Sequence, residues 1–322
     1  MKYICPQEVI TAIAAGDISA LDGFRQMRDM DQRMDAAMRK PASSKQKAED
    51  SSKKMEEILR ELDALIGLNE VKKLVREIYA FLEIQKRREK EHLITEPLVL
   101  HMIFKGNPGT GKTTVARILG KIFCEMGVLS RGHLLEVERA DLVGEYIGHT
   151  AQKTREQLKK AYGGILFIDE AYSLARGGEK DFGKESIDVL VKAMEDHKNE
   201  LILILAGYRD EMDGFLQANP GLHSRFPIHI NFLDYTQEEL LAISEQMCNK
   251  RQYRFTKEAK LALLKLLIRP SGEKEEHFGN ARTIRNIIER AIRRQAVRLM
   301  AKQVTTREDL VTLEAEDLLE VK

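Results

Sequence analysis

The chain has few of the residues that build disulfide-linked, zinc-binding or membrane-spanning proteins. Among its 322 residues there are only three cysteines, and they lie far apart, at Cys5, Cys124 and Cys248. The sequence contains neither a Cys-x-x-Cys nor a His-Glu-x-x-His pattern. We therefore expect reduced, mostly buried thiols rather than a disulfide framework or a zinc site. The longest aliphatic run, residues 201–206, is far too short to cross a membrane.

The chain also lacks an excess of either charge. Its 52 Lys and Arg residues balance 51 Asp and Glu residues, which leaves a net charge of +1. This balance gives no general attraction to nucleic acid or to an anionic membrane, so we expect neither DNA or RNA binding nor membrane insertion. The first ten residues contain no apolar run of the length of a signal peptide, and we expect a cytoplasmic protein.

The first 54 residues are expected to form an extension of the folded body. Residues 1–39 are weakly helical in pattern, and Met27, Met30, Met34 and Met38 recur at helical spacing. They predict either a small helical hairpin that packs on the body or a docking element for a partner, because methionine-rich faces adapt to many surfaces. Residues 40–54 are polar and charged, which predicts a linker.

Residues 55–233 alternate between short apolar runs and helical patterns. We expect helices over 55–64 and after Asn69, which is a good N-cap residue. Helices are also expected over 151–162 and 184–197. Strands are predicted at residues 101–104, 134–137, 164–168, 201–206 and 227–232. This alternation is typical of an α/β domain in which helices cover both faces of a parallel sheet.

Residues 234–322 have a helical pattern and predict a second, small α-helical domain. Thr236 and Glu239 have the spacing of a capping box at the start of its first helix. Thr256 caps a second predicted helix, which runs to Ile268, and residues 281–301 predict a long basic helix.

A glycine-rich stretch at residues 100–117 predicts a phosphate-binding loop. It satisfies the pattern G-x-x-x-x-G-K-[ST] at Gly106, Gly111, Lys112 and Thr113, between a predicted strand and a predicted helix. Glycines let successive backbone N–H groups face an anion, and the helix N-terminus adds a positive dipole end. Lys112 is suited to the β- and γ-phosphates and the Thr113 hydroxyl to Mg²⁺. The expected nucleotide contacts are Asn107, Pro108, Gly109, Thr110, Gly111, Lys112, Thr113 and Thr114.

Two carboxylates follow the predicted strand at residues 164–168. In a parallel sheet this strand end borders the ligand crevice. Asp169 is placed to hold Mg²⁺, and Glu170 to act as the general base that polarises the attacking water. The alternative is a pair of helix-capping carboxylates, which the nearby phosphate loop makes the weaker interpretation.

The phosphate loop, the acidic pair and the helical tail together resemble the AAA+ ATPases. Residues 106–117, 140–154, 163–185 and 203–208 resemble the CbbX/CfxQ family, which includes red-type Rubisco activases and sporulation proteins. The longer of these segments, residues 140–154 and 163–185, are more similar to the sporulation members than to the Rubisco activases. The resemblance covers roughly residues 62–298 and leaves residues 1–54 unplaced. It implies an AAA+ P-loop fold, a small helical domain, and hydrolysis of ATP with Mg²⁺. It further implies a homo-oligomeric ring, expected to be a hexamer, that remodels or threads a protein substrate.

The resemblance also implies roles for residues outside the two motifs. Ile66 and Gly67 match the segment that lies along the adenine in such ATPases. Arg225 matches the arginine finger that reaches the γ-phosphate of a neighbouring subunit, although the residue alone fits a surface ion pair equally well. Arg282 matches the second sensor, an arginine of the helical domain that touches the γ-phosphate. Arg285, one turn further along the same face, is the competing choice.

Tyr146 is the expected contact with a protein substrate. It lies between Gly144 and Gly148, and flanking glycines predict a mobile loop. The family places this aromatic residue in a central pore, where a ring can grip many side chains without reading their sequence. The alternative is a core tyrosine. Residues 176–183 are also flanked by glycine and are a candidate for a second pore loop.

The chain departs from the wider AAA+ pattern at one position. The fourth strand of these proteins usually ends in a polar sensor residue, often Asn or Thr, whereas Gly207 and Tyr208 follow it here. A tyrosine hydroxyl is able to orient water, but the sequence leaves the first sensor unassigned.

Two other functions are compatible with parts of the sequence. A nucleic-acid machine of the clamp-loader or initiator type would use the basic helix that contains Arg285, Arg290, Arg293, Arg294 and Arg298. The neutral net charge and the aromatic pore loop argue against it. A non-hydrolysing, ATP-switched scaffold is disfavoured because both Asp169 and Glu170 are present.

Overall fold

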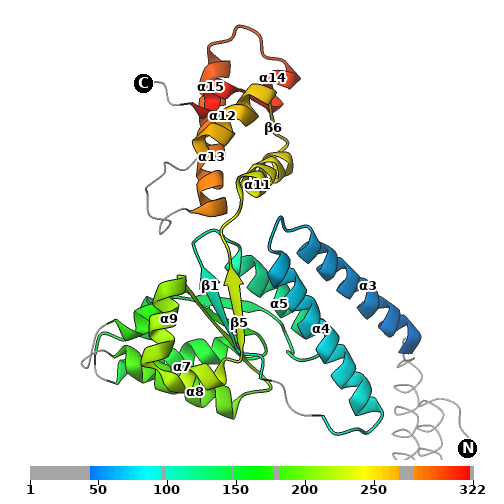
Figure 1. Ribbon diagram of the computed structural model, residues 1–322, viewed down its shortest axis with the longest axis vertical. Helices are drawn as coiled ribbons and strands as arrows, with labels where there is room; N and C mark the ends of the chain where they lie inside the picture. Colours follow the sequence, from blue (N-terminus) through cyan, green and yellow to red (C-terminus); the bar gives the residue numbers. More distant parts are fainter. Residues whose placement is uncertain (1–43, 96–98, 147, 177–181, 268–278, 320–322) are drawn as a thin grey trace, which may run out of the picture. The chain divides into compact units, whose positions relative to one another are not determined.

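The computed structural model describes residues 44–95, 99–146, 148–176, 182–267 and 279–319 (Figure 1). The chain divides into two compact units, residues 1–56 and residues 57–322. The expectations for residues 1–39, for the loop centred on 177–181 and for Ile268 lie outside the described residues. Among the described residues, none of the helices is both long and apolar enough to span a membrane.

The second unit begins with an α/β sheet region. Its strands are β1 (Met102–Gly106), β2 (Leu134–Val137), β3 (Ile165–Ile168), β4 (Ile202–Gly207) and β5 (Ile228–Phe232). Its helices are the end of α3 (Ser44–Asp63), α4 (Asn69–Lys90), α5 (Lys112–Glu125), α6 (Arg139–Leu142), α7 (His149–Ala161), η1 (Ala171–Ala175), α8 (Gly183–Asp196), α9 (Arg209–Ala218) and α10 (Pro220–Arg225). The five predicted strands are confirmed to within one or two residues at each end.

The strands pair in the order β2–β3–β4–β1–β5, and every pair is parallel. Parallel strands need long crossover connections, which the intervening helices supply. Strand β4 therefore lies between β1 and β3, with Ile204 opposite Met102 on one side and Phe167 opposite Ile204 on the other. The carboxyl ends of these three strands meet at one edge of the sheet, which is where open α/β sheets bind their ligands.

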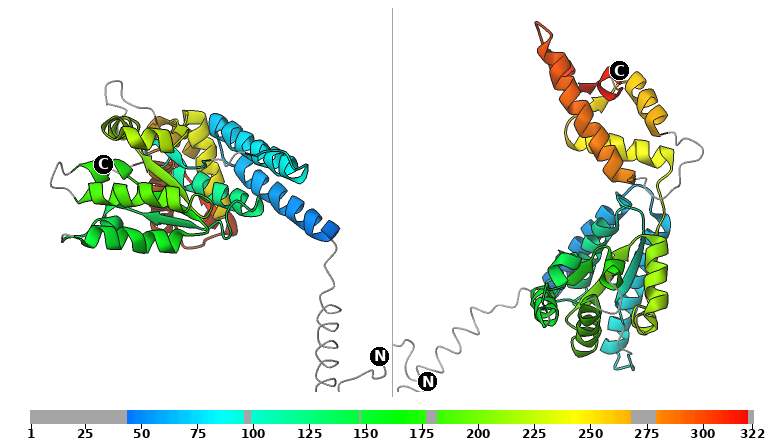
Figure 2. Two further views of the ribbon diagram at one scale, coloured as in Figure 1. Left: turned by 90° about the horizontal axis from the view of Figure 1, so that it is seen from below. Right: turned by 90° about the vertical axis from the view of Figure 1, so that its left-hand side faces the viewer.

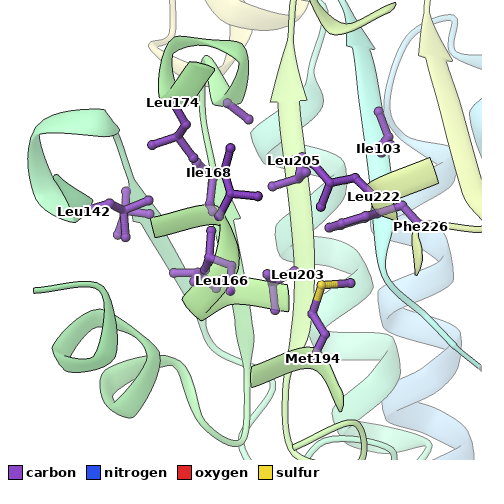
Figure 3. Close-up of a cluster of buried hydrophobic side chains, with 14 of the residues drawn as sticks. Ile103, Leu142, Leu166, Ile168, Leu174, Met194, Leu203, Leu205, Leu222 and Phe226 are labelled. Atoms are coloured by element: carbon purple, nitrogen blue, oxygen red, sulfur yellow. The ribbon is translucent and has the colours of Figure 1, made fainter. Parts of the chain in front are cut away.

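Each face of the sheet packs against a separate set of helices (Figure 2). Residues Ile103, Leu166, Ile168, Leu203 and Leu205 lie in one buried cluster with side chains of α7, α8 and α9 (Figure 3). Because successive strand residues point to opposite faces, Phe104 and Phe167 point the other way. There the Phe104 ring contacts those of Phe167 and Phe232, at centroid distances of 6.3 and 5.0 Å.

The C-terminal part of the unit is a helical lid. It consists of α11 (Gln237–Lys250), β6 (Arg254–Phe255), α12 (Lys257–Leu267), α13 (Asn280–Met300), α14 (Arg307–Val311), β7 (Thr312–Leu313) and α15 (Ala315–Leu318). It has its own apolar core, which includes Leu240, Leu263, Ile284, Ile288 and Leu313. The predicted capping box is confirmed: the Glu239 N–H donates to the Thr236 hydroxyl, and the Glu239 carboxylate accepts from the Thr236 N–H.

Two local predictions are wrong. The stretch 40–54 was expected to be a linker, but helix α3 begins at Ser44 and continues to Asp63. Lysine is the most frequent residue in this stretch, and lysine, glutamine, alanine and glutamate are all strong helix formers, so a polar composition did not exclude a helix. Asn69 was expected to cap α4, but Leu68 takes the cap position in a left-handed conformation and Asn69 is the first helical residue. The turn at residues 66–68 therefore determines where α4 begins, and the preference of asparagine for the N-cap position does not.

The buried side chain of His101, which immediately precedes β1, makes the stability of the folded protein depend on pH. It is 4% exposed, and its Nδ1 accepts a hydrogen bond from the Leu203 N–H. Burial lowers the pKa of His101 to about 4, only partly offset by its hydrogen bond with the Met194 backbone. The imidazole is therefore neutral in the folded protein at pH values at which an unfolded chain has begun to protonate it.

We expect this histidine to make unfolding sensitive to mild acid. Between pH 6.5 and 4 the unfolded state binds the extra proton, so stability falls as pH falls through this window. From pH 7 to pH 5 the loss is about 2 kcal/mol. Urea unfolding at the two pH values should show that His101→Gln removes about this much of the pH dependence. An identical pH dependence in the two proteins would contradict the assignment.

Candidate functional site

A cavity of about 520 Å³ lies where the carboxyl ends of β1, β3 and β4 meet the lid. The sheet contributes the phosphate loop after β1, the acidic pair after β3, and Gly207 and Tyr208 at the end of β4. The lid contributes residues of α11 and α13. The sheet order explains the convergence, because the three strands that carry these motifs are adjacent.

Glycines with positive φ angles and hydrogen bonds to its carbonyl groups fix the conformation of the phosphate loop. Gly109 and Gly111 have φ angles of 73° and 100°, which favour glycine. The buried Thr110 hydroxyl donates to the Asn107 carbonyl at 2.7 Å. The Tyr235 hydroxyl donates to the Thr110 carbonyl at 3.0 Å. Helix α5 begins immediately afterwards at Lys112 without a side-chain cap, so its N-terminal N–H groups face the cavity.

The ammonium group of Lys112 points back toward the phosphate loop. Its Nζ donates to the carbonyls of Gly106 and Asn107, at 2.7 and 2.9 Å. Burial lowers the pKa of Lys112, and the positive charge of Arg282 acts in the same direction, whereas the carboxylate of Asp169 raises it. A lysine held between carbonyl oxygens in a partly desolvated cavity is suited to bind an incoming anion.

Asp169 and Glu170 line the same cavity. The Glu170 N–H donates to Asp169 Oδ1 at 3.0 Å, and the Ser173 N–H donates to the Glu170 carbonyl at 2.8 Å. Glu170 itself has a φ of 47°, a left-handed backbone that non-glycine residues rarely adopt. Such strain persists only where the surroundings fix it, and it occurs often at functional sites.

The residues present fit a magnesium ion bound together with a polyphosphate. Thr113 and Asp169 both line the cavity and offer oxygen ligands. Within the described residues, no cluster of three or more His, Cys, Asp or Glu side chains could hold a metal by itself. Mg²⁺ is commonly bound by one or two protein oxygens, substrate phosphates and water, which matches this sparse set.

The lid places two arginines at the cavity, Arg282 and Arg285. They lie one turn apart on α13, so both can reach the same space. A Cβ at Gly109 would lie 2.7 Å from the backbone nitrogen of Arg282, which places Arg282 beside the phosphate loop, and its positive charge helps to lower the pKa of Lys112. The Arg282 N–H is itself fixed by a hydrogen bond to the Gly279 carbonyl at 2.8 Å.

Part of the cavity lining is apolar. Leu65, Ile66 and Leu68 contribute to it from the segment before α4, and Ile243 and Met247 from α11, next to the polar Gln246 and Lys250. An aromatic base can pack against such apolar side chains. Gly67 does not line the cavity; its φ of 64° turns the chain here, close to the side chains of Tyr235 and Glu239.

Several predicted residues lie away from the cavity lining. Asn107 and Thr110 support the loop from behind, where the Asn107 amide donates to both oxygens of Asp234, at 3.0 and 3.1 Å. Arg225 forms a surface ion pair with Glu195 at 2.6 Å and donates to the Gly221 carbonyl. Tyr146 is 66% exposed, which rules out the core alternative, and its ring contacts that of His149.

A buried polar junction behind the phosphate loop was not predicted. Asn280 is fully buried and donates to Asp234 Oδ1 at 2.7 Å, while its side-chain oxygen accepts from the Tyr235 N–H at 3.0 Å. The only signal in the sequence was a polar residue at the start of each segment, Asp234 before α11 and Asn280 before Arg282. Such residues are common at helix starts and do not indicate that they meet.

Family models match both parts of the second unit. Residues 102–233 match the model described as "ATPase family associated with various cellular activities (AAA)". Residues 236–321 match the AAA lid domain.

Individual proteins and structures agree with these matches. The chain is 56% identical to stage V sporulation protein K of Bacillus subtilis (strain 168), over 82% of each chain. It is 51% identical to the protein CfxQ homolog of Galdieria sulphuraria, over 83% of this chain and 88% of the other. The crystal structure of the FIGL-1 AAA domain in complex with ADP aligns with a TM-score of 0.54 at 17% identity. That alignment covers 79% of this chain and 80% of the other, and at this identity it supports the fold alone.

We expect Gly109→Ala to weaken nucleotide binding by at least about ten-fold, because a side chain has no room there. A Cβ at Gly109 would press directly on the Gly279 carbonyl oxygen and lie 2.7 Å from the Arg282 nitrogen. The φ of 73° adds strain of about 1 kcal/mol for a non-glycine residue. Titration with a fluorescent ADP analogue measures the effect.

Gly214→Ala is the matched control, since an added Cβ at Gly214, within α9, would meet nothing within 4 Å. It should leave nucleotide affinity unchanged and slightly increase stability. Equal affinities of Gly109→Ala and the unaltered protein would show that the loop does not depend on its close contact with the lid.

Proposed function

Because the chain belongs to the CbbX/CfxQ family of AAA+ ATPases, we propose that it hydrolyses ATP within a ring of identical subunits and thereby remodels or threads a protein substrate. Residues 55–233 form the nucleotide-binding domain, residues 234–322 the lid, and residues 1–54 an extension. The observation that carries the proposal is the convergence of the phosphate loop, the acidic pair and Arg282 around one cavity.

Each residue of the cavity has a distinct role in this proposal. The N-terminal N–H groups of α5 and Lys112 bind the phosphates, and Thr113 and Asp169 hold Mg²⁺, which neutralises charge on the phosphate oxygens. A water oxygen bonds to the γ-phosphorus while the bond from that phosphorus to the bridging oxygen breaks, and the electron pair leaves with ADP. Glu170 accepts the proton that the water releases and passes it to phosphate or solvent.

The position of Arg225 supports the proposed ring. This residue does not line the cavity of its own chain, and its side chain is 36% exposed beside Glu195. For Arg225 to act on a γ-phosphate, that phosphate must be bound by the next subunit, and such head-to-tail contacts close into rings. We propose a hexamer, in keeping with the family resemblance.

A protein substrate is favoured over nucleic acid. Tyr146 offers an exposed aromatic ring in a loop that begins at a glycine. The basic face of α13, in contrast, is partly used inside the lid. Arg294 donates to the Leu319 carbonyl at 2.7 Å, and Arg298 forms a two-pronged ion pair with the buried Asp317. The name of the Bacillus subtilis relative supports a role in bacterial sporulation.

We expect Glu170→Gln to lower ATP turnover at least about 100-fold, because the amide keeps the shape of the side chain and cannot accept the water proton. Phosphate release measures turnover, and a fluorescent ATP analogue measures binding, which should be retained.

The same Glu170→Gln variant tests the class of substrate. With ATP bound, a photo-crosslinking residue in place of Tyr146 in this variant should label a polypeptide. Normal turnover would remove Glu170 as the base, and crosslinking to DNA would contradict a protein substrate.

We expect Arg225→Ala to lower turnover by about 10³, the usual effect of losing an arginine finger. Mixing it with Lys112→Ala subunits should restore activity, because only mixed rings place an intact phosphate loop beside an intact Arg225. Glu195→Gln is the control: it breaks the ion pair within the chain and should keep activity. Two inactive variants that stay inactive when mixed, or a fully active monomer, would exclude an arginine supplied by a neighbour.

A further inference from the structure

Glu170 and Tyr146, the residues proposed for hydrolysis and for substrate contact, belong to segments that leave the sheet next to each other. Strand β2 leads into the short helix α6, and the loop that carries Tyr146 follows α6 directly. Strand β3, which pairs with β2, leads into Glu170 and the 3₁₀ helix η1. Side chains of α6 are therefore able to reach the segment that contains the proposed base.

The segment after Glu170 is a closed turn of buried residues. The Ser173 N–H donates to the Glu170 carbonyl at 2.8 Å, and residues 171–174 of η1 are buried. Glu170 itself has the left-handed backbone described above, with a φ of 47°. Because the turn is closed by a hydrogen bond and enclosed by neighbours, a displacement of Glu170 also displaces the Ser173 carbonyl.

Arg139 joins this turn to α6. It is the first residue of α6, and its Nη1 donates to the Ser173 carbonyl at 2.5 Å. A hydrogen bond from a charged donor is stronger than one between neutral groups. An apolar contact supports it, since Leu142 of α6 and Leu174 of η1 lie in the same buried cluster (Figure 3). Arg139 thus connects the turn of the proposed base with the helix that precedes the Tyr146 loop.

The guanidinium of Arg139 also lies against the first residue of α8, Gly183. A Cβ at Gly183 would lie 3.1 Å from Arg139 Nη1 and would overlap the Leu174 carbonyl oxygen, so glycine is required there. Arg139 is therefore confined where α6, η1 and α8 meet. In such a close-packed junction a shift of the turn is passed on to α6 rather than absorbed by rotation of the arginine side chain.

On its other side, α6 is fixed to α7, and so is the start of the Tyr146 loop. Hydrogen bonds run from Lys153 Nζ to the Ala140 and Val143 carbonyls, at 2.5 and 3.3 Å, from the Thr154 hydroxyl to the Leu142 carbonyl, at 3.1 Å, and from the Gly144 N–H to the buried Thr150 hydroxyl, at 3.0 Å. All of these bonds end before Tyr146, whose ring is exposed. A displacement of α6 therefore moves the base of the loop and the Tyr146 ring with it.

We propose that Arg139 is a positioning residue that couples ATP hydrolysis to the substrate contact, because its hydrogen bond to the Ser173 carbonyl transmits movement of the Glu170 turn to α6 and Tyr146. Loss of the γ-phosphate changes what the Glu170 carboxylate faces, the turn shifts, and the Tyr146 loop shifts with it. This inference rests on the proposed function and names the residue through which its two parts act on each other.

The chain contains no tryptophan, so Tyr146→Trp introduces a single fluorescent reporter and keeps an aromatic ring at the loop. In the full chain with Mg²⁺, its emission should differ between bound ADP and a bound, slowly hydrolysed ATP analogue. Adding Arg139→Met should reduce this difference at least about five-fold, because methionine cannot donate to the Ser173 carbonyl. ATP turnover and the affinity for a fluorescent ADP analogue should stay within about three-fold, since the cavity keeps all of its groups.

Two further variants in the same background separate coupling from structure. Arg139→Lys keeps a charged donor and should recover about half of the emission difference. Arg155→Met, an exposed position on α7, is the matched control and should leave the difference unchanged. Hydrogen exchange of residues 139–146 in the unaltered chain needs no variant, and it should also differ between the two nucleotides.

The coupling role is overturned if Arg139→Met keeps the full emission difference. It is also overturned if the unaltered loop shows neither an emission nor an exchange difference between the two nucleotides. Loss of turnover together with the emission difference, without recovery in Arg139→Lys, would show that Arg139 only supports the fold and would overturn it as well. In the first two cases normal phosphate release leaves the proposed ATP hydrolysis standing. If the unaltered chain releases no phosphate from ATP, the proposed function fails and the inference falls with it.

Discussion

The contact between the phosphate loop and the first turn of α13 is the constraint on which the rest of the second unit depends. The Gly109 carbonyl accepts the Ala281 N–H at 3.2 Å, and the Pro108 carbonyl accepts the Asn280 amide at 3.4 Å. Partly buried backbone groups lose free energy without such partners, so the loop cannot change shape without moving the lid or breaking these bonds. Sheet domain and lid thus share one hydrogen-bonded element, and that element is where a nucleotide would bind.

Charge explains why a polyphosphate would strengthen this contact. Lys112 from the sheet domain and Arg282 from the lid face the same cavity, and their mutual repulsion contributes to the lowered pKa of Lys112. Lys112 Nζ also donates to the loop carbonyls of Gly106 and Asn107. A bound triphosphate would satisfy both cations at once and favour the arrangement in which they converge. The free energy of binding is then partly a free energy of closing the lid on the sheet domain, and loss of the last phosphate would reduce it.

Sequence patterns predicted the sheet well because each strand is a short apolar run buried on both faces, a signal that depends only on local composition. They also placed Lys112, Asp169 and Glu170 at one edge, since parallel strands bring their carboxyl ends together. Prediction failed where distant segments decide the outcome. The cap of α4 at Leu68 depends on the turn before it, and the junction of Asp234, Tyr235 and Asn280 depends on the lid meeting the phosphate loop. No local preference of an aspartate, tyrosine or asparagine indicates such a meeting.

A movement at the cavity can be transmitted through the lid because hydrogen bonds hold its long helix, α13, near both ends. At one end the Asn280 amide donates hydrogen bonds to the Pro108 carbonyl of the phosphate loop and to Asp234 Oδ1. Near the other, Gln295 Nε2 donates to the carbonyls of Asp309 and Thr312, at 2.9 and 2.8 Å, and Arg298 grips Asp317 with two hydrogen bonds. Helix α13 has 21 residues and is therefore about 30 Å long. A rotation of about 10° at the Asn280 end would displace the far end by about 5 Å. In the proposed cycle, a rigid lid would convert the small change caused by losing one phosphate into a shift large enough to alter a contact with another protein surface.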